Sequence, residues 1–342
     1  MLADVAFTAV PSLKHNKSGH PEHNGRVSAI MDVLHEAKLF ERMVEISDPA
    51  PATINQVATV HAEDYIRQLC IQAESAPIYV DPAPTYITRA SFDCALHAAG
   101  AAIALVDAIL DNRACTGFAL IRPPGHHALP LAATGFCLFA NVAIAARHAQ
   151  KRGTERILIV DFDVHHGNGT QDIFYADNSV YFVSLHQTGI YPGSGHASET
   201  GVDGGNGFTL NIPLPVNAGG RAVQQVIDQL LIPAARRFAP ELILVSAGFD
   251  AHWRDHIAGL QYASRDYHTL AIALQELASE LCSGKLAFFL EGGYDLAALA
   301  NSAENVFLAL LREPPKDTLG PPPQPQPDIQ PLLAYLRHGH SF

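Results

Sequence analysis

The stretch VDFDVHHGNGT, residues 160–170, concentrates groups that could bind a metal or transfer protons. It follows the apolar run ILIV, which is typical of a buried strand, and it places Asp161, Asp163 and His165 at every second position. In an extended strand this spacing puts all three side chains on one side. Burying such groups is costly unless something compensates their charge. The spacing therefore indicates a site for a cation.

Carboxylate oxygens combined with an imidazole nitrogen favour a divalent metal of intermediate hardness, either zinc or iron(II). A catalytic zinc takes three protein ligands and keeps one position open for water. Asp163 and His165 supply two ligands, and Asp250, in SAGFDAH, is the best candidate for the third. A strand end capped by solvated polar side chains is the alternative that the spacing alone leaves open.

Two further motifs carry groups that suit hydrolysis. His126 and His127 stand together in RPPGHHA, and imidazoles titrate near neutral pH. A carboxylate such as Asp161 would make one of them more basic, and an amide such as Asn168 would leave the other less basic. Tyr294 follows two glycines and could donate a hydrogen bond to a developing oxyanion. Surface histidines and a packing tyrosine are the alternatives.

These motifs follow short apolar runs that we interpret as buried strands. The runs are 118–121, 157–162, 180–185, 208–212, 242–247 and 286–291. Helix-like segments lie between them, at 90–111, 140–151, 221–238, 264–282 and 295–311. Strands alternating with helices predict a parallel sheet covered on both faces. Active sites of such sheets lie beyond the carboxyl ends of the strands, so we expect the four polar strand ends to converge.

Composition narrows the class of protein. The chain has 342 residues, of which 48% are hydrophobic and 16% are charged, and this balance fits a large buried core. The net charge is −12 with no run of Lys or Arg, which argues against a nucleic-acid partner. Five scattered cysteines without a CxxC pattern favour reduced thiols, and we read neither a signal peptide nor a membrane span. We therefore expect a cytoplasmic protein.

Several ordered motifs match a known pattern. They are HPEHNGR, RPPGHHA, GFCLFAN, VDFDVHHGNGT, SLHQ, YPGSG, SAGFDAH and LEGGYDL. Together they resemble the histone deacetylase superfamily, which includes acetylpolyamine amidohydrolases, and they look closest to its class II and bacterial branch. The resemblance implies a single arginase-like α/β domain with an eight-stranded parallel sheet, over residues 1–312. A Pro-rich extension, 313–342, would pack on the body or on a neighbouring subunit of a homo-oligomer.

The resemblance implies a role for each polar residue of these motifs. The zinc ligands would be Asp163, His165 and Asp250. His126 would pair with Asp161, and His127 with Asn168, as tandem proton-transfer histidines. Tyr294 would polarise the acyl carbonyl.

The resemblance also implies a substrate channel and an exit. Gly135 and Phe136, with Tyr191 opposite, would line a narrow channel for an acyl-lysine-like chain. Asp81 would contact the backbone or amine of the substrate, and Arg26 would line an inner path for acetate.

Two structural monovalent cations, potassium or sodium, are implied as well, bound partly through main-chain oxygens. The first site would use Asp161, Asp163, His165, Ser184 and Leu185. The second would use Phe174, Asp177, Val180 and Phe208.

The segment after Asp250 departs from the family pattern. It reads AHWRDHIAGLQ, with His256 where relatives often have proline and Ile257 where they have leucine. Polyamine-preferring relatives can carry a gatekeeper glutamate here, and none stands at Ile257. We therefore expect a zinc-dependent deacetylase of an acetylated or acylated amine, with acetyl-lysine favoured over an acetylpolyamine or a small N-acetylamide.

Two rival functions use the same motifs. A ureohydrolase with two manganese ions would need a second carboxylate-rich set near Asp250, where the chain has Ala251 and His252. A silent acyl-binding module would be expected to lack a ligand, a histidine or the tyrosine, and all are present.

Overall fold

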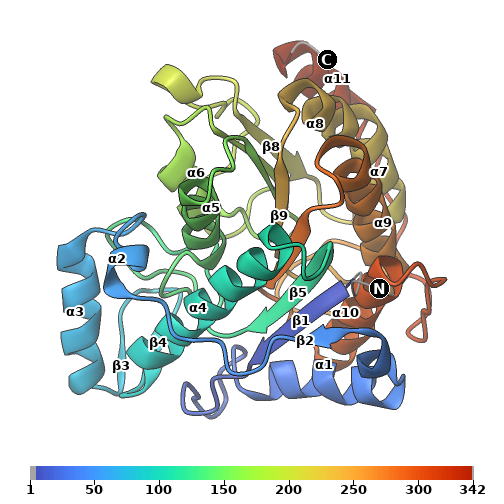
Figure 1. Ribbon diagram of the computed structural model, residues 1–342. Coiled ribbons are helices and arrows are strands. Elements are labelled where there is room, and N and C mark those ends of the chain that lie inside the picture. Colours follow the sequence, from blue (N-terminus) through green and yellow to red (C-terminus); the bar gives the residue numbers. More distant parts are fainter. Residues whose placement is uncertain (1–4, 341–342) are drawn as a thin grey trace.

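One twisted sheet forms the centre of this computed structural model, which describes residues 5–340 (Figure 1). Eight strands pair in the order β2-β1-β5-β10-β9-β6-β7-β8, and all neighbours are parallel. They are β1 (Val5–Val10), β2 (Val44–Glu45), β5 (Thr116–Ile121), β6 (Ile157–Asp161), β7 (Val180–Gln187), β8 (Thr209–Leu214), β9 (Leu242–Ala247) and β10 (Leu286–Leu290). The predicted α/β fold is confirmed. All six predicted runs form strands, whereas β1 and β2 were not predicted.

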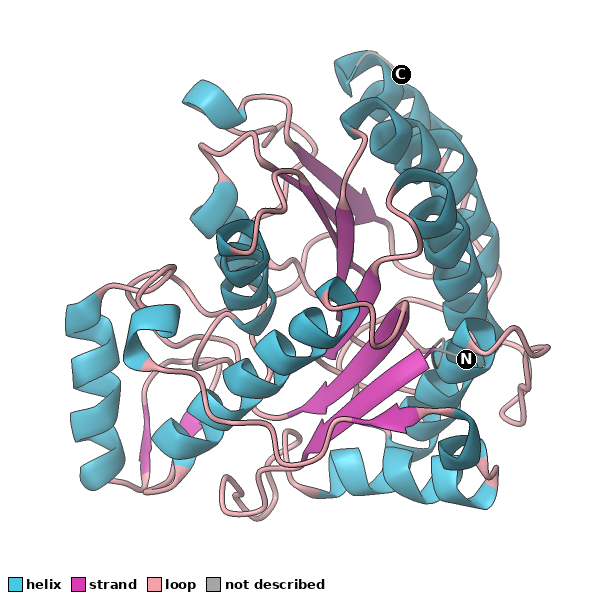
Figure 2. Ribbon diagram, in the orientation of Figure 1, coloured by secondary structure: helices cyan, strands magenta, loops and turns pink. Residues whose placement is uncertain are grey.

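The central strands β5, β6, β7, β9 and β10 are buried along their whole length because both faces of the sheet are covered. In β6, Leu158 and Val160 belong to the core on one face, and Ile157 and Ile159 to the core on the other. Alternation with a period of two explains this division. Figure 2 shows the helices on both sides of the strands.

The helices divide between the two faces. On one face lie α2 (Ile54–Val57), α3 (Glu63–Glu74), α4 (Ser91–Leu110), α5 (Asn141–Lys151) and α6 (Asn168–Phe174). On the other lie α1 (Gly25–Glu36), α7 (Gly220–Val226), η3 (Ile227–Leu231), α8 (Ile232–Phe238), α9 (Ser264–Leu281), α10 (Leu296–Leu310) and α11 (Gln330–His340). Short elements complete the fold: η1 (Leu39–Arg42), η2 (Asp203–Gly205) and the antiparallel pair β3 (Ile78–Tyr79) and β4 (Tyr86–Ile87).

The strand order decides where the polar motifs meet. The four strands whose carboxyl ends carry them, β5, β10, β9 and β6, are consecutive neighbours in the middle of the sheet. The register places Asp161, the last residue of β6, level with Ser246 in β9 and Ser184 in β7. Motifs far apart in the chain are therefore brought to one edge of the sheet.

The C-terminal segment lies against the rest of the chain. Leu333 and Leu336 of α11 are buried, and this helix contacts η3 and β8. Before it, the Arg221 guanidinium donates to the carbonyl oxygens of Gln326 and Pro327, both at 2.8 Å.

Helix α4 is long and apolar enough to cross a membrane by length and composition alone, which we did not expect from the sequence. However, 61% of its apolar window is buried in the protein, where it packs against α5 and β5. A core helix passes the same test, so α4 is weak evidence for a membrane span.

Gly100, in the middle of α4, lets this helix approach the loop at residues 50–52. A Cβ at this position would collide with the Ala50 carbonyl oxygen and lie 2.7 Å from Ala52 N. We expect Gly100→Ala to lower the free energy of unfolding by about 1–3 kcal/mol through overpacking, measured by urea denaturation. The control is Gly339→Ala in α11, where a Cβ would meet nothing within 4 Å. Equal destabilisation by the two changes would contradict this packing argument.

Candidate active site

Asp163, His165 and Asp250 form a cluster that could hold a metal ion at the carboxyl ends of β6 and β9. Their ligand atoms all lie within 4.8 Å of one another. His165 Nδ1 is 3.1 Å from Asp163 Oδ1 and 3.3 Å from Asp250 Oδ2. The structure therefore brings together the three residues that were predicted as ligands.

The donor atoms of this cluster fit a divalent cation. Asp250 Oδ2 is buried and makes no well-formed hydrogen bond among the described residues, although His165 Nδ1 lies 3.3 Å away. Burial, together with the charge of Asp163, raises the pKa of Asp250 to about 6. A bound cation would satisfy the free oxygen and relieve the repulsion between the two carboxylates. Two carboxylates and one imidazole match zinc or iron(II) chemistry.

Backbone groups fix the orientation of both carboxylates. Val164 N–H donates to Asp250 Oδ1 at 3.0 Å, and Gly292 N–H donates to Asp163 Oδ2 at 2.8 Å. Gly248 and Gly292 make room for them, because a Cβ at either position would collide with Asp163 or with Asp250. Glycines in SAGFD and LEGGY are thus required by the packing around the cluster.

The tandem histidines lie beside the cluster with different partners. His126 Nδ1 donates to Asp161 Oδ2 at 2.9 Å, and His127 Nδ1 donates to Asn168 Oδ1 at 2.7 Å. Their ring centroids are 4.0 Å apart. Both predicted pairings are therefore present in the structure.

These partners separate the protonation of the two rings. Burial opposes charge on His126, but Asp161 and Asp163 outweigh it and hold the pKa of His126 well above its ordinary value. Burial and the neighbouring His126 and His165 hold the pKa of His127 well below its ordinary value. His127 is therefore neutral near pH 7, with Nδ1 protonated toward Asn168 and Nε2 able to accept a proton.

Glu291 is a site residue that the sequence reasoning missed. Its buried carboxylate accepts hydrogen bonds from Gly125 N–H at 2.7 Å and His126 N–H at 3.1 Å, and from Ser246 Oγ at 3.3 Å. Burial raises its pKa to about 7. The carboxylate thus fixes the backbone that carries His126. The sequence feature that could have identified it is an ionisable residue directly after the apolar run LAFFL.

Tyr294 is held from two sides and leaves its hydroxyl free. Its ring stands edge-on to Phe136 at 5.9 Å, and the Arg26 guanidinium lies 5.0 Å from the ring centroid. Arg26 is fully buried and donates to the carbonyl oxygens of Gly293 at 2.7 Å and Glu291 at 2.5 Å. Within residues 5–340 no protein group hydrogen-bonds to Tyr294 Oη.

Two of the residues predicted to line the channel, Gly135 and Tyr191, lie against His127. The Tyr191 ring stands edge-on to His127 at 5.0 Å, and a Cβ at Gly135 would collide with the His127 ring. Asp81 Oδ2 accepts from Gly135 N–H at 3.0 Å, and its Oδ1 accepts from Thr85 N–H at 2.6 Å. Asp81 therefore holds the turn at Gly135 through hydrogen bonds to the backbone. Its predicted contact with the substrate stays a prediction.

The side chains at the predicted monovalent sites already have partners. Ser184 Oγ bonds His186 Nδ1 at 2.9 Å, and the Asp177 carboxylate pairs with Arg147 at 2.7 Å. At the second predicted site, the Phe174 carbonyl oxygen accepts a hydrogen bond from Asp177 N–H. Both sites would rely on main-chain oxygens and stay predictions. The other members predicted there are Leu185, Val180 and Phe208.

His166, which had no predicted role, points away from the metal cluster. Its Nδ1 bonds Ser194 Oγ at 2.8 Å and its Nε2 bonds Gln171 Oε1 at 3.0 Å. Burial lowers its pKa to about 4. This neutral ring supports the loop that carries Tyr191.

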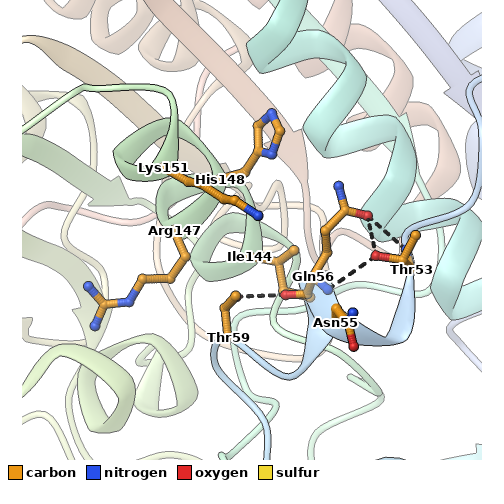
Figure 3. Close-up of a pocket in the computed structure, with 8 residues that line it drawn as sticks. All are labelled: Thr53, Asn55, Gln56, Thr59, Ile144, Arg147, His148 and Lys151. Carbon is orange, nitrogen blue, oxygen red and sulfur yellow. Dashed lines mark hydrogen bonds between the residues drawn. The ribbon is translucent and has the colours of Figure 1, made fainter.

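A separate pocket of about 260 Å³ lies between α2 and α5 (Figure 3). Two of its basic side chains are already paired, Arg147 with Asp177 at 2.7 Å and His148 with Asp107 at 2.8 Å. Its lining holds no carboxylate or thiol, so it lacks the carboxylate oxygens of the metal cluster.

Comparisons with known proteins agree with this site. A family model described as the histone deacetylase domain matches residues 20–310. The chain is 42% identical to "Histone deacetylase 10, chloroplastic" of Oryza sativa subsp. japonica, across 99% of this chain and 82% of that protein. It is 39% identical to "Polyamine deacetylase HDAC10" of Mus musculus, across 86% of this chain and 45% of that protein.

The fold agrees as well. The crystal structure of the HDA15 HD domain matches with a TM-score of 0.86 at 34% identity, across 93% of this chain and 91% of that one. The fold and the site thus define a family of hydrolases that act on amides. This chain belongs to the histone deacetylase family.

If Asp250 is a metal ligand, Asp250→Ala should purify with far less than one equivalent of metal, because the cluster would lose one of its three protein donors. Metal content after reconstitution with zinc, measured by plasma mass spectrometry, checks this. The control is Asp32→Ala, which removes an exposed carboxylate of α1. One full equivalent of zinc in Asp250→Ala would refute the assignment.

Proposed function

We propose that this protein is a zinc-dependent deacetylase that hydrolyses the amide of an acetylated or acylated amine, with acetyl-lysine as the preferred substrate. The observation that supports this most is the pairing of a metal-type cluster with two histidines of opposite protonation. His126 is held charged by Asp161, and His127 is held neutral beside Asn168. Amide hydrolysis needs a base for water and then an acid for the leaving amine; a neutral imidazole can serve as both in turn, while a charged imidazole beside it stabilises developing negative charge.

Zinc bound by Asp163, His165 and Asp250 would polarise the acyl carbonyl and lower the pKa of a bound water toward about 7. Side chains of the protein carry out the proton transfers. Neutral His127 accepts a proton from the attacking water at Nε2 and then delivers it to the leaving amine. Asn168 keeps His127 Nδ1 protonated, so only Nε2 is available as a base.

Charge that develops on the carbonyl oxygen is stabilised by hydrogen bonding. The free hydroxyl of Tyr294 donates to this oxygen as it becomes negative, which is the role of an oxyanion-hole donor. Charged His126, bonded to Asp161, adds positive potential at the same point. After the carbon–nitrogen bond breaks, the products are acetate and the free amine.

The walls of the channel favour an acyl-lysine side chain. Phe136 and Tyr191, which contact Tyr294 and His127, offer aromatic surface to an aliphatic chain. Ile257, at the position where polyamine-preferring relatives can carry a glutamate, is 37% exposed and offers no negative charge to a polyamine. The alternative substrate is an acetylpolyamine, which the relative named as a polyamine deacetylase supports.

Other predicted properties remain part of the proposal. They are the structural potassium or sodium ions, the cytoplasmic location, the homo-oligomeric state and the division into residues 1–312 and 313–342. The donor set fits both zinc and iron(II), and the activity after reconstitution with each metal would separate the two.

The oxyanion role of Tyr294 predicts a large kinetic effect without loss of metal. Tyr294→Phe should lower kcat by about 10²- to 10³-fold, as removal of one such donor does elsewhere, while KM changes little. Steady-state kinetics on an acetyl-lysine peptide, with metal analysis, measure this. Tyr335→Phe, on the exposed side of α11, is the control. Wild-type turnover in Tyr294→Phe would exclude the role.

The substrate proposal predicts a rank order of kcat/KM. Acetyl-lysine peptides should exceed acetylspermidine by at least tenfold, because the rim lacks a carboxylate at residue 257 for a second ammonium group. A chelator should abolish both activities, and added zinc should restore them. Ile257→Glu should shift the ratio toward acetylspermidine. If the wild-type protein preferred acetylspermidine, the acetyl-lysine proposal would be wrong and the acetylpolyamine alternative would take its place.

A further inference from the structure

Asp255 lies in the loop after β9, five positions beyond Asp250, and is 5% exposed. Its Oδ2 accepts hydrogen bonds from Tyr294 N–H at 2.5 Å and from Asp295 N–H at 3.0 Å. Its Oδ1 accepts from Ile257 N–H at 3.2 Å. One buried carboxylate therefore binds the backbone of Tyr294 and the backbone of the rim residue Ile257.

The turn that carries Tyr294 needs such an anchor. Gly293 has a φ of +113°, which places the turn in a conformation that glycine adopts readily. Directly after it, α10 begins, with Asp295 as the N-cap that accepts from Ala298 N–H at 2.9 Å. Asp295 satisfies one N–H of the first turn, and Asp255 satisfies the two that precede the helix. The Asp255 carboxylate thus fixes the position of the Tyr294 backbone, from which the tyrosine side chain extends.

We propose that Asp255 is a positioning residue for Tyr294. Its carboxylate holds the tyrosine backbone at a fixed distance from the metal ligand Asp250, which the same loop carries. The loop at residues 250–257 therefore determines the relative positions of the metal ligand Asp250, the oxyanion donor Tyr294 and the rim residue Ile257. The inference rests on the proposed deacetylase function, because it assigns Asp255 an effect on catalysis through Tyr294.

The test variant is Asp255→Asn, which keeps the size of the side chain but places an amide N–H₂ against a backbone N–H. Displacement of a catalytic group by about 1 Å can cost about 10²-fold in rate. We expect kcat to fall by about 10- to 100-fold, with KM for an acetyl-lysine peptide nearly unchanged and one equivalent of zinc retained. Asp255→Ala should lower kcat further.

A double-mutant cycle separates positioning from a general effect on the fold. If Asp255 acts through the tyrosine, Asp255→Asn should lower kcat little when it is added to Tyr294→Phe, because the hydroxyl that it positions is gone. If it acts only on the fold, the two changes should multiply. Multiplicative effects would overturn the inference, as would wild-type kcat in Asp255→Asn.

Asp266→Asn is the matched control. Asp266 is also a mostly buried carboxylate at the start of a helix, and it accepts from Ala263 N–H at 2.7 Å without touching Tyr294. This control should lose stability without losing kcat. Loss of zinc or of folded structure in Asp255→Asn would assign Asp255 to the fold and overturn the inference. An inactive wild-type zinc enzyme would instead refute the proposed function.

Discussion

The site depends on how buried negative charge is compensated at the ends of the central strands. Asp161, Asp163, Asp250 and Glu291 are all buried, and isolated carboxylates in such positions would be unstable. Backbone N–H groups, the imidazoles and, in our proposal, a divalent cation share this compensation. The glycines around the cluster follow from the same constraint, because the carboxylates fill the space that a Cβ would occupy.

The segment LEGGY, residues 290–294, links the parts of the site. The Glu291 carboxylate holds the histidine loop, Gly292 N–H holds Asp163, and Tyr294 N–H is held by Asp255. Buried Arg26 binds two carbonyl oxygens of the same segment. In our proposal, one short stretch of backbone thus positions a metal ligand, a proton-transfer group and an oxyanion donor, and rigid neighbouring strands support it.

The two histidines illustrate how environment assigns chemistry. They are adjacent in sequence and both are buried, yet a carboxylate faces one and an amide faces the other. The carboxylates outweigh burial and raise the pKa of His126, whereas burial and the neighbouring imidazoles lower the pKa of His127. The acid–base chemistry that we propose is therefore a property of the packing around β6 as much as of the histidines themselves.

The sequence by itself determined the central strands and the metal-type ligands, because apolar runs and a spacing of two are local signals. It also placed the polar motifs at strand ends, and with the family resemblance it paired each histidine with its partner. The strands β1 and β2, at one side of the sheet, were missed. Only the tertiary structure decided that Glu291 supports His126 and that Asp255 supports Tyr294, since these contacts join residues 165 and 39 positions apart. No local pattern encodes such contacts, because the sheet order and loop packing that create them depend on the whole fold.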